Sequence, residues 1–222
     1  MTTSMTSLWE VPRLTPGAER ILEVASDLFY RRGIHAVGVD TIAAESGVTK
    51  RTLYDRFGSK EQLVAAYLAA RHRLWWERLE ARIIDTPAPR ALAFFDAYAD
   101  DLVPGERGCA FLNAAGELPI DHPAYRIVQE HKRAVRRRLE ELLRADVLDS
   151  DAVGETADHL MLLLEGAVAH RGIDGTNRLA QRARGIAVDL LSPRGSLQTT
   201  VSEDRHGDDH GPSGHDDRAG EH

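Results

Sequence analysis

The chain has 222 residues with 28 basic and 35 acidic side chains, so its formal net charge is −7. Its 42% hydrophobic and 28% charged residues are typical of a globular protein and exclude a fibrous or wholly disordered one. No apolar run reaches the roughly 20 residues of a membrane helix, and residues 1–10 do not resemble a signal peptide. Cys109 is the only cysteine, which excludes an intrachain disulfide. We therefore expect a cytoplasmic protein without a metal, a cofactor or a membrane partner.

The hydrophobic pattern is helical throughout the chain. Apolar residues recur at spacings of three and four, and no segment alternates as a strand would. Caps, glycines and prolines set the expected helix ends, as with Ser59 and Gln62, which fit a capping box. The sequence therefore predicts an all-α fold with about nine helices, at 15–33, 39–46, 50–57, 59–84, 90–102, 109–118, 121–144, 151–171 and 176–191.

The last thirty residues differ from the rest in composition. They hold seven acidic and three basic side chains, and almost no large apolar ones. Such a segment cannot offset its ordering entropy by burial, so we expect it to be disordered and solvated. Its four histidines could instead recruit a metal, although their loose spacing favours the solvated interpretation.

The strongest pattern lies between Val39 and Phe57, where residue types fit a helix-turn-helix. Ala43 is small enough for the second helix to cross closely, and Gly47 suits the sharp turn. Three apolar residues fill the angle between the helices: Ile42, Val48 and Leu53. Residues 49–60 carry a net charge of +3, so the acidic chain has a basic tip at this motif.

This basic tip is suited to DNA. In a helix-turn-helix, the first residues of the second helix meet base edges in the major groove. Lys50 and Arg51 can donate hydrogen bonds to guanine O6 and N7, whereas Tyr54 and Lys60 suit phosphate oxygens. We therefore predict double-stranded DNA as a partner, contacted by Thr41, Thr49, Lys50, Arg51, Thr52, Tyr54 and Lys60.

The two last expected helices indicate a dimer. Residues 160–164 are all apolar and cover every side of a helix, and the following helix carries a narrow apolar stripe. Two such helices predict a homodimer built as a four-helix bundle, with an interface of Leu160, Leu163, Leu164, Leu179, Ala183, Ile186 and Leu190. The alternative is that both helices complete the core of a single chain.

The segment from Ile42 to Glu61 closely resembles the DNA-binding domain of TetR-family transcriptional regulators, above all in its Leu-Tyr-x-x-Phe-x-Ser-Lys-Glu core. The resemblance implies a three-helix head and an all-helical body, and it divides the chain into a flexible arm (1–14), a DNA-binding domain (15–58), an effector-binding and dimerisation domain (59–191) and the tail (192–222). It also implies a homodimeric repressor of a palindromic operator, released when a small-molecule effector of unknown identity moves the helix at 59–84.

Three residues depart from the family pattern. Arg51 stands where a small residue is frequent, Gly38 where a capping Ser or Thr is common, and Arg56 where an aromatic residue or His is frequent. Because Arg51 and Arg56 lie on the helix expected to read DNA, no operator sequence is carried over. Residues 107–123 resemble one subgroup of these regulators, which implies the fold of the body and not its ligand.

An effector pocket needs mostly apolar walls and a few polar groups. The candidates, each of which could equally be a core residue, are Trp75, Trp76, Phe94, Phe95, Tyr98, Phe111, Asn113, Glu117, His122 and Tyr125. Asn113 and Glu117 share a helix face at a spacing of four. We expect Cys109 to be a buried inert thiol, with a thiol sensor as the alternative.

Two other classes of function remain as alternatives. His122 with Glu117 or Asp121 could be a proton-transfer pair, but the sequence has no phosphate loop, nucleophile elbow or metal-ligand motif, so we do not expect an enzyme. The second alternative keeps the TetR-like fold in an interaction protein, or in a DNA binder without a defined operator. Salt-dependent binding without sequence preference would support it.

Overall fold

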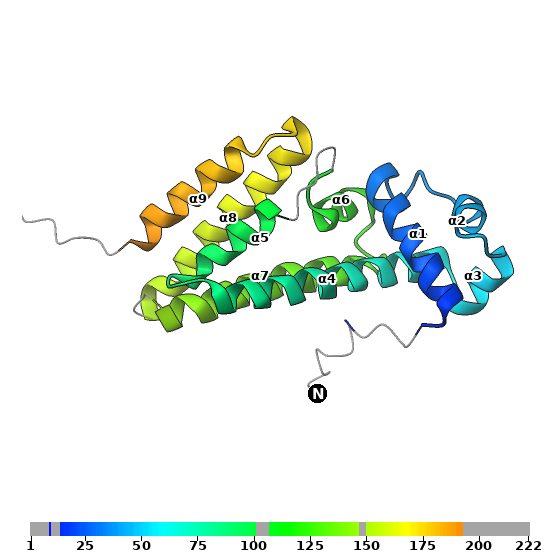
Figure 1. Ribbon diagram of the computed structural model, residues 1–222, viewed down its shortest axis with the longest axis horizontal. Coiled ribbons are helices and arrows are strands. Elements are labelled where there is room, and N and C mark those ends of the chain that lie inside the picture. The colour runs from blue at the N-terminus through cyan, green and yellow to red at the C-terminus, as the bar shows by residue number, and fades with distance from the viewer. Residues whose placement is uncertain (1–8, 10–13, 101–106, 147–149, 193–222) are drawn as a thin grey trace, which may run out of the picture. The chain divides into compact units, whose positions relative to one another are not determined.

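The computed structural model describes residue 9 and residues 14–100, 107–146 and 150–192. Within these ranges the chain forms only helices, which confirms the predicted all-α class (Figure 1). They are α1 (Pro16–Arg32), α2 (Val39–Ser46), α3 (Lys50–Phe57), α4 (Lys60–Asp85), the short 3-10 helix η2 (Arg90–Leu92), α5 (Ala93–Asp100), α6 (Ala110–Glu117), α7 (Tyr125–Asp146), α8 (Ser150–Asp174) and α9 (Arg178–Leu191). None of these helices is long and apolar enough to cross a membrane.

Side-chain caps determine where three of the helices begin. The hydroxyl oxygens of Thr15, Thr49 and Ser59 accept hydrogen bonds from backbone N–H groups in the first turns of α1, α3 and α4. Each cap satisfies a donor that the helix itself leaves unpaired. Because caps act locally, the starts of α1 and α3 agree with the sequence prediction.

Two helix starts differ from their predictions. The helix expected from residue 90 begins as the 3-10 turn η2, where the backbone N–H and guanidinium of Arg90 bind the Asp146 carboxylate. The helix expected from residue 121 begins at Tyr125, because His122 first closes a turn by donating its N–H to the Pro119 carbonyl at 3.0 Å. In both cases, a hydrogen bond to a residue outside the helix explains why the helix does not begin where the sequence predicts.

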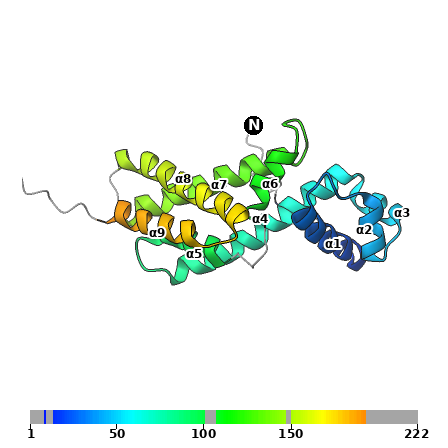
Figure 2. The ribbon, with the colours of Figure 1, turned by 90° about the horizontal axis from the view of Figure 1, so that it is seen from above.

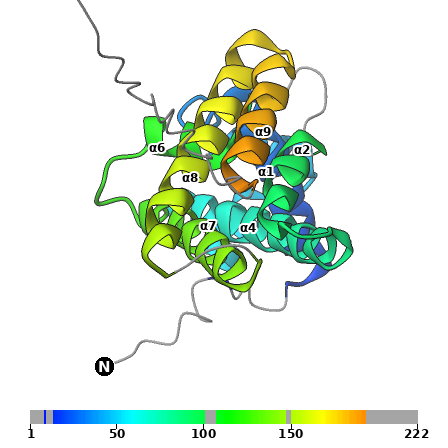
Figure 3. The same cartoon turned by 90° about the vertical axis from the view of Figure 1, so that its left-hand side faces the viewer.

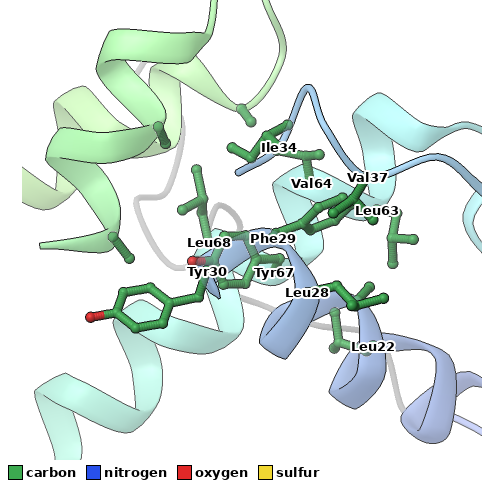
Figure 4. Packing of buried hydrophobic residues seen from close by; sticks show 14 of the residues in the cluster. Leu22, Leu28, Phe29, Tyr30, Ile34, Val37, Leu63, Val64, Tyr67 and Leu68 are labelled. Atoms are coloured by element: carbon green, nitrogen blue, oxygen red, sulfur yellow. The ribbon is translucent and has the colours of Figure 1, made fainter. Parts of the chain in front are cut away.

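Two clusters of buried apolar side chains hold the helices together. The first joins α1–α3 to the first half of α4, to α6 and to the start of α7, and Figure 4 shows Phe29, Tyr67 and Leu68 within it. The second joins the rest of α4 and α7 to α5, α8 and α9, with Phe94 and Leu160 fully buried. We call them the head-side core and the far-side core.

α4 and α7 contribute to both cores and lie side by side (Figures 1 and 2). α8 packs against α7 and α9, as the end view in Figure 3 shows. The segment before α6 approaches α8 so closely that a Cβ on Gly108 would lie 2.8 Å from the Val168 carbonyl oxygen, and one on Gly172 would lie 2.8 Å from that of Arg107. Both positions therefore need glycine.

The expected arm lies outside the described residues except for Trp9 and Leu14, and the expected tail lies outside them except for Ser192. The chain's first compact unit, residues 1–192, contains both cores.

Candidate functional site

The turn between α2 and α3 has the geometry that the sequence predicts. Gly47 ends α2 in the left-handed conformation, with φ 71° and ψ 18°. A Cβ at Gly47 would meet no atom within 4 Å, so the backbone conformation and not crowding favours glycine there. Ile42 and Leu53 are 0% exposed, and Val48 packs against their cluster, so the two helices cross on a buried apolar contact.

The start of α3 is held by a pair of threonines. The Thr49 hydroxyl accepts from the Thr52 N–H at 3.1 Å and lies 3.0 Å from the Thr52 hydroxyl. Thr49 therefore caps α3 and orients Thr52, while both remain near the outer end of the helix. Thr41, on α2, is half-buried.

The outer face of α3 presents cations and a phenol to solvent. The Arg51 side chain is 91% exposed, with its Nε 3.9 Å from the Asp55 carboxylate. Lys50 pairs with Asp40 of α2 across the turn, and Tyr54 is 45% exposed. Exposed pairs of this kind contribute about 0–1 kcal/mol, so a DNA phosphate or base can replace the carboxylate partners at little cost.

Lys60 is the first residue of α4, next to the Ser59 cap. Burial lowers the pKa of Lys60, while the carboxylates of Glu61 and Glu117 act in the opposite direction. An anion bound beside Lys60 would favour the charged ammonium, and the dipole of α4 favours negative charge at this end of the helix. Lys60 and the start of α4 thus lie next to α3 in the sequence and are suited to bind a phosphate.

A small cavity lies where the head-side core and the far-side core meet. Its volume is about 30 Å³, and its lining residues are Arg71, Trp75, Tyr98, Gly108, Cys109, Ala110, Phe111, His131 and Val168. Among the ten candidate pocket residues, Trp75, Tyr98 and Phe111 line this cavity, whereas Phe94 and Phe95 lie in the far-side core. A space of this size holds about one water molecule, so a larger ligand must move a wall.

The other candidate pocket residues have different surroundings. Asn113 donates its side-chain N–H to the Arg107 carbonyl at 3.0 Å, and His122 Nδ1 accepts from the Ala124 N–H at 3.1 Å. Tyr125 packs against the head-side core, and Trp76 lines a separate groove between α4 and α7. Glu117 accepts from the His35 N–H at 3.0 Å. These residues do not line the small cavity.

Two buried histidines were missed by the sequence analysis. His72 of α4 and His131 of α7 are 6% and 2% exposed, and their Nδ1 atoms lie 2.9 Å apart. Burial lowers the pKa of His72 to about 4 and holds the pKa of His131 well below its usual range, so both rings are neutral at pH 7. The helical periodicity could have indicated that His131 is buried, because it lies four residues after Ile127 and four before Val135.

The cavity wall is tied to α1. The Tyr30 hydroxyl donates to the Gly108 carbonyl at 2.9 Å, and its ring lies 4.5 Å from the Arg71 guanidinium. Glu117 adds its bond from His35 in the loop after α1. Residues 107–117 therefore touch both the cavity and the helix-turn-helix side of the molecule.

The predicted dimer residues divide into two groups. Leu160, Leu164 and Ala183 are 0%, 1% and 6% exposed and fill the far-side core of one chain, so the single-chain alternative describes these three. Leu163 and Leu179 are half-buried, while Ile186 and Leu190 of α9 are 36% and 39% exposed.

α8 adds two exposed apolar side chains outside the predicted set, Leu162 at 72% and Ile173 at 77%. Exposed Gly166 and Ala169 lie between them at helical spacing, so the four residues share one stripe of α8. We call this stripe, together with Ile186 and Leu190, the α8/α9 face.

Comparison with known proteins assigns the family. The sequence profile described as "Bacterial regulatory proteins, tetR family" matches residues 21–67, which include α2 and α3. The HTH-type transcriptional repressor Rv3405c of Mycobacterium tuberculosis is 32% identical over 171 residues, which cover 68% of this chain and 87% of that protein. The chain belongs to the TetR family of transcriptional regulators. Its helix-turn-helix is thus a DNA-binding domain, as the sequence motif predicts.

Solved structures agree with this assignment to the TetR family. SCO4454, a TetR-family transcriptional regulator from Streptomyces coelicolor, is 35% identical, with a TM-score of 0.71 over 79% of this chain and 93% of that one. The transcriptional activator FasR of Mycolicibacterium smegmatis is 47% identical over 49 residues, but this match covers only 22% of FasR. The similarity to Rv3405c and SCO4454 thus extends through the body, whereas the match to FasR is short.

Proposed function

We propose that this TetR-family regulator is a homodimeric repressor that reads a two-fold related operator through α3 and is released by a small-molecule effector. The observation that carries the proposal is the exposed cationic face of α3, mounted on the buried contact of Ile42 and Leu53. A rigid helix with exposed donors at its first turns can enter a major groove. The relative Rv3405c is named as a repressor, which supports repression rather than activation.

Arg51 on α3 and Lys60 at the start of α4 have different roles. Arg51 donates to base edges, so Arg51→Ala is expected to reduce discrimination at one operator position by about 1–3 kcal/mol. Lys60 contacts phosphate, so Lys60→Ala is expected to weaken binding to all duplexes and to reduce the salt slope by about 0.9. Fluorescence anisotropy on an operator and on a random duplex, across a salt series, measures both effects.

Arg144→Ala is the matched control, because it removes one exposed cation from the far end of α7. We expect it to leave both duplex affinities unchanged. If Arg51→Ala and Lys60→Ala act identically on operator and random duplexes, the division into base and phosphate contacts is wrong, and a binder without a defined operator is the better interpretation.

The α8/α9 face supports the dimer part of the proposal. A monomer rarely exposes so many clustered apolar side chains, and small Gly166 and Ala169 allow a second helix to approach closely. Two copies of α8 and α9 would bury this face as a four-helix bundle. The two copies of α3 would then reach half-sites about one helical turn apart, roughly 34–36 Å or somewhat more.

Leu162→Asp tests the dimer directly. We expect sedimentation velocity to show a shift from dimer to monomer, because a carboxylate would be buried at the contact. Ile120→Asp is the control, since Ile120 is 77% exposed but lies outside the α8/α9 face. A Leu162→Asp protein that stays dimeric, or an Ile120→Asp protein that dissociates, would refute the assignment of this face.

The release step is supported by the ties between the cavity and α1. An effector that displaces Phe111 or Ala110 would strain the hydrogen bonds that Gly108 and Glu117 make to Tyr30 and His35. An effector that binds the displaced form about 100-fold better shifts the equilibrium by about 2.7 kcal/mol.

Ala110→Leu mimics this displacement without a ligand, because Ala110 lines the cavity and is 4% exposed, so three added carbons crowd its neighbours. We expect operator affinity to fall at least tenfold while the protein remains a folded dimer. Ala152→Leu, at the exposed start of α8, is the matched control and should bind normally. Unchanged operator affinity in Ala110→Leu would separate the cavity from DNA binding.

A further inference from the structure

Trp9 lies far along the chain from the helices that it contacts. Its indole stacks on the imidazole of His72, with ring centroids 3.6 Å apart and an interplanar angle of 20°. The two rings stand beside Trp76, whose centroid is 5.2 Å from that of His72. They line a groove of about 420 Å³ between α4 and α7, to which Arg73 and Arg137 also contribute.

Four rings form a continuous series from this groove to the small cavity. His72 shares its Nδ1 contact of 2.9 Å with His131, and the His131 ring stacks on Phe111 at 3.6 Å and 9°. Trp9, His72, His131 and Phe111 thus come from the N-terminal segment, α4, α7 and α6 in turn. His131 and Phe111 line the cavity, whereas Trp9 and His72 line the groove.

The two histidines stand where the two cores meet. On α4 the head-side core ends at Ala70 and the far-side core begins at Trp75; on α7 the corresponding residues are Val128 and Val135. A contact between two Nδ1 atoms needs one ring to donate and the other to accept, so neither ring can turn without breaking it. Buried polar contacts of this kind fix the positions of their members.

We propose that His72, together with Trp76 at the edge of this groove, is the docking site of Trp9, and that the four rings link this docking to the state of the cavity. A displaced Phe111 removes the stack on His131, which alters its contact with His72 and so the platform under Trp9. Because stacked aromatic pairs stabilise each other, loss of the Phe111 stack shifts Trp9 from its docked position toward a free one.

This link gives the cavity a second route to the DNA-binding domain. Trp9 lies seven residues before Pro16, the first residue of α1. A chain of that length spans at most about 25 Å, so anchoring Trp9 on α4 and α7 limits where α1 can move. The first route, through Gly108 and Glu117, does not involve Trp9.

Fluorine NMR of the full chain labelled with 5-fluorotryptophan tests the proposal without DNA or an effector. The three resonances of Trp9, Trp75 and Trp76 are assigned with single Trp→Phe variants. In the unsubstituted chain we expect the Trp9 resonance to be shifted from that of free 5-fluorotryptophan and to show a reduced shift between H₂O and D₂O. A fully solvated Trp9 resonance would overturn the docking site.

Phe111→Leu then tests the link, because Phe111 stacks on His131, and His131 contacts the His72 ring on which Trp9 stacks. We expect the Trp9 resonance to move by more than its linewidth toward the free position. Val168→Ala is the matched control, since it changes the cavity wall outside the ring series and should leave Trp9 in place. A Trp9 resonance that ignores Phe111→Leu, or follows Val168→Ala equally, would overturn the link.

The H₂O/D₂O measurement on the unsubstituted chain needs no core variant, so it decides the docking site even if Phe111→Leu fails to fold. Because neither measurement uses DNA, failure of this proposal would leave the proposed repressor function untouched.

Discussion

The head-side core and the far-side core share α4 and α7 but support different surfaces. The head-side core carries α3, whose outer face is cationic and whose ion pairs are exposed. The far-side core carries α8 and α9, whose outer face is apolar. Both cores are closed by fully buried aliphatic side chains, such as Leu53 and Leu139.

This difference separates the two kinds of binding. Exposed cations with weakly held partners can exchange carboxylates for phosphates at little cost, which suits reversible binding to DNA. An apolar face is stabilised only by being covered, which suits a lasting contact with a second copy. The cavity and the pair of His72 and His131 lie between the two cores.

The largest expected effect tests whether the two cores unfold together. Leu53→Ala in the head-side core and Leu139→Ala in the far-side core should each lower the free energy of unfolding by about 2–5 kcal/mol. Because α4 and α7 belong to both cores, we expect one shared transition in urea, seen at the same midpoint by circular dichroism and by tryptophan fluorescence.

Leu74→Ala is the control for this comparison, since Leu74 is 51% exposed and should change stability by less than about 0.5 kcal/mol. All variants are measured at one protein concentration, so that any self-association affects them equally. Two separate transitions, with Leu53→Ala moving only one of them, would show that the cores are independent.

The next effect is the pH dependence of stability that comes from His72 and His131, which lie where the two cores meet. Burial lowers the pKa of His72 to about 4, against about 6.5 when unfolded, so between these pH values the unfolded chain binds the proton more readily. Stability should therefore fall as pH decreases from about 6.5 to 4, by on the order of 3 kcal/mol from His72 alone. The low pKa of His131 acts in the same direction.

Urea midpoints measured from pH 7 to pH 4 check this expectation. The double variant His72→Gln/His131→Gln should lose less stability over this range than the unsubstituted chain, since carboxylates titrate in both. His159→Gln, on the exposed surface of α8, should keep the full pH dependence. Equal slopes in the double variant and the unsubstituted chain would contradict the neutral buried pair.

A smaller effect is expected at the turn of the DNA-binding domain. Gly47→Ala places an L residue at φ 71° and should lower stability by about 1–2 kcal/mol. Gly116→Ala, inside α6 with no neighbouring atom within 4 Å, should instead raise stability by about 0.5–1 kcal/mol. Thermal unfolding measures the change in stability of both variants. A change in the same direction in both would contradict the conformational explanation.

The smallest effect concerns the start of α2. Gly38 is its N-cap, with φ −86° and ψ 158°, and it has no side chain to cap the helix. Gly38→Ser should add a few tenths of a kcal/mol by supplying an acceptor, whereas Gly38→Ala should not. Chemical denaturation compares the two, and equal stability would show that no cap forms.

The sequence predicts the DNA-binding domain well because its determinants are local. Thr49 caps α3 from the adjacent position, and Gly47 sets the turn by its own backbone angle. The body depends on long-range packing. The spacing of Ala183 and Ile186 fits one stripe, yet the structure buries the first and exposes the second.

The cavity shows the same limit. Trp75 and Phe94 are both aromatic residues on helices, and nothing local tells that the first lines the cavity while the second is 0% exposed in the core. The sequence predicts Glu117 as a residue of the effector pocket, but its carboxylate accepts a hydrogen bond from the backbone N–H of His35, 82 positions away. By contrast, His72 and His131 each lie at helical spacing among core residues, so periodicity could have indicated that both are buried.

Selection of bound duplexes from a random pool tests the central proposal most directly. A dimer that presents two copies of α3 should enrich one sequence as two inverted half-sites centred about one helical turn apart, and Arg51→Ala should relax the preference at one position of each half. A pool that shows no enriched sequence, bound equally by the unsubstituted chain and by Arg51→Ala, would contradict it.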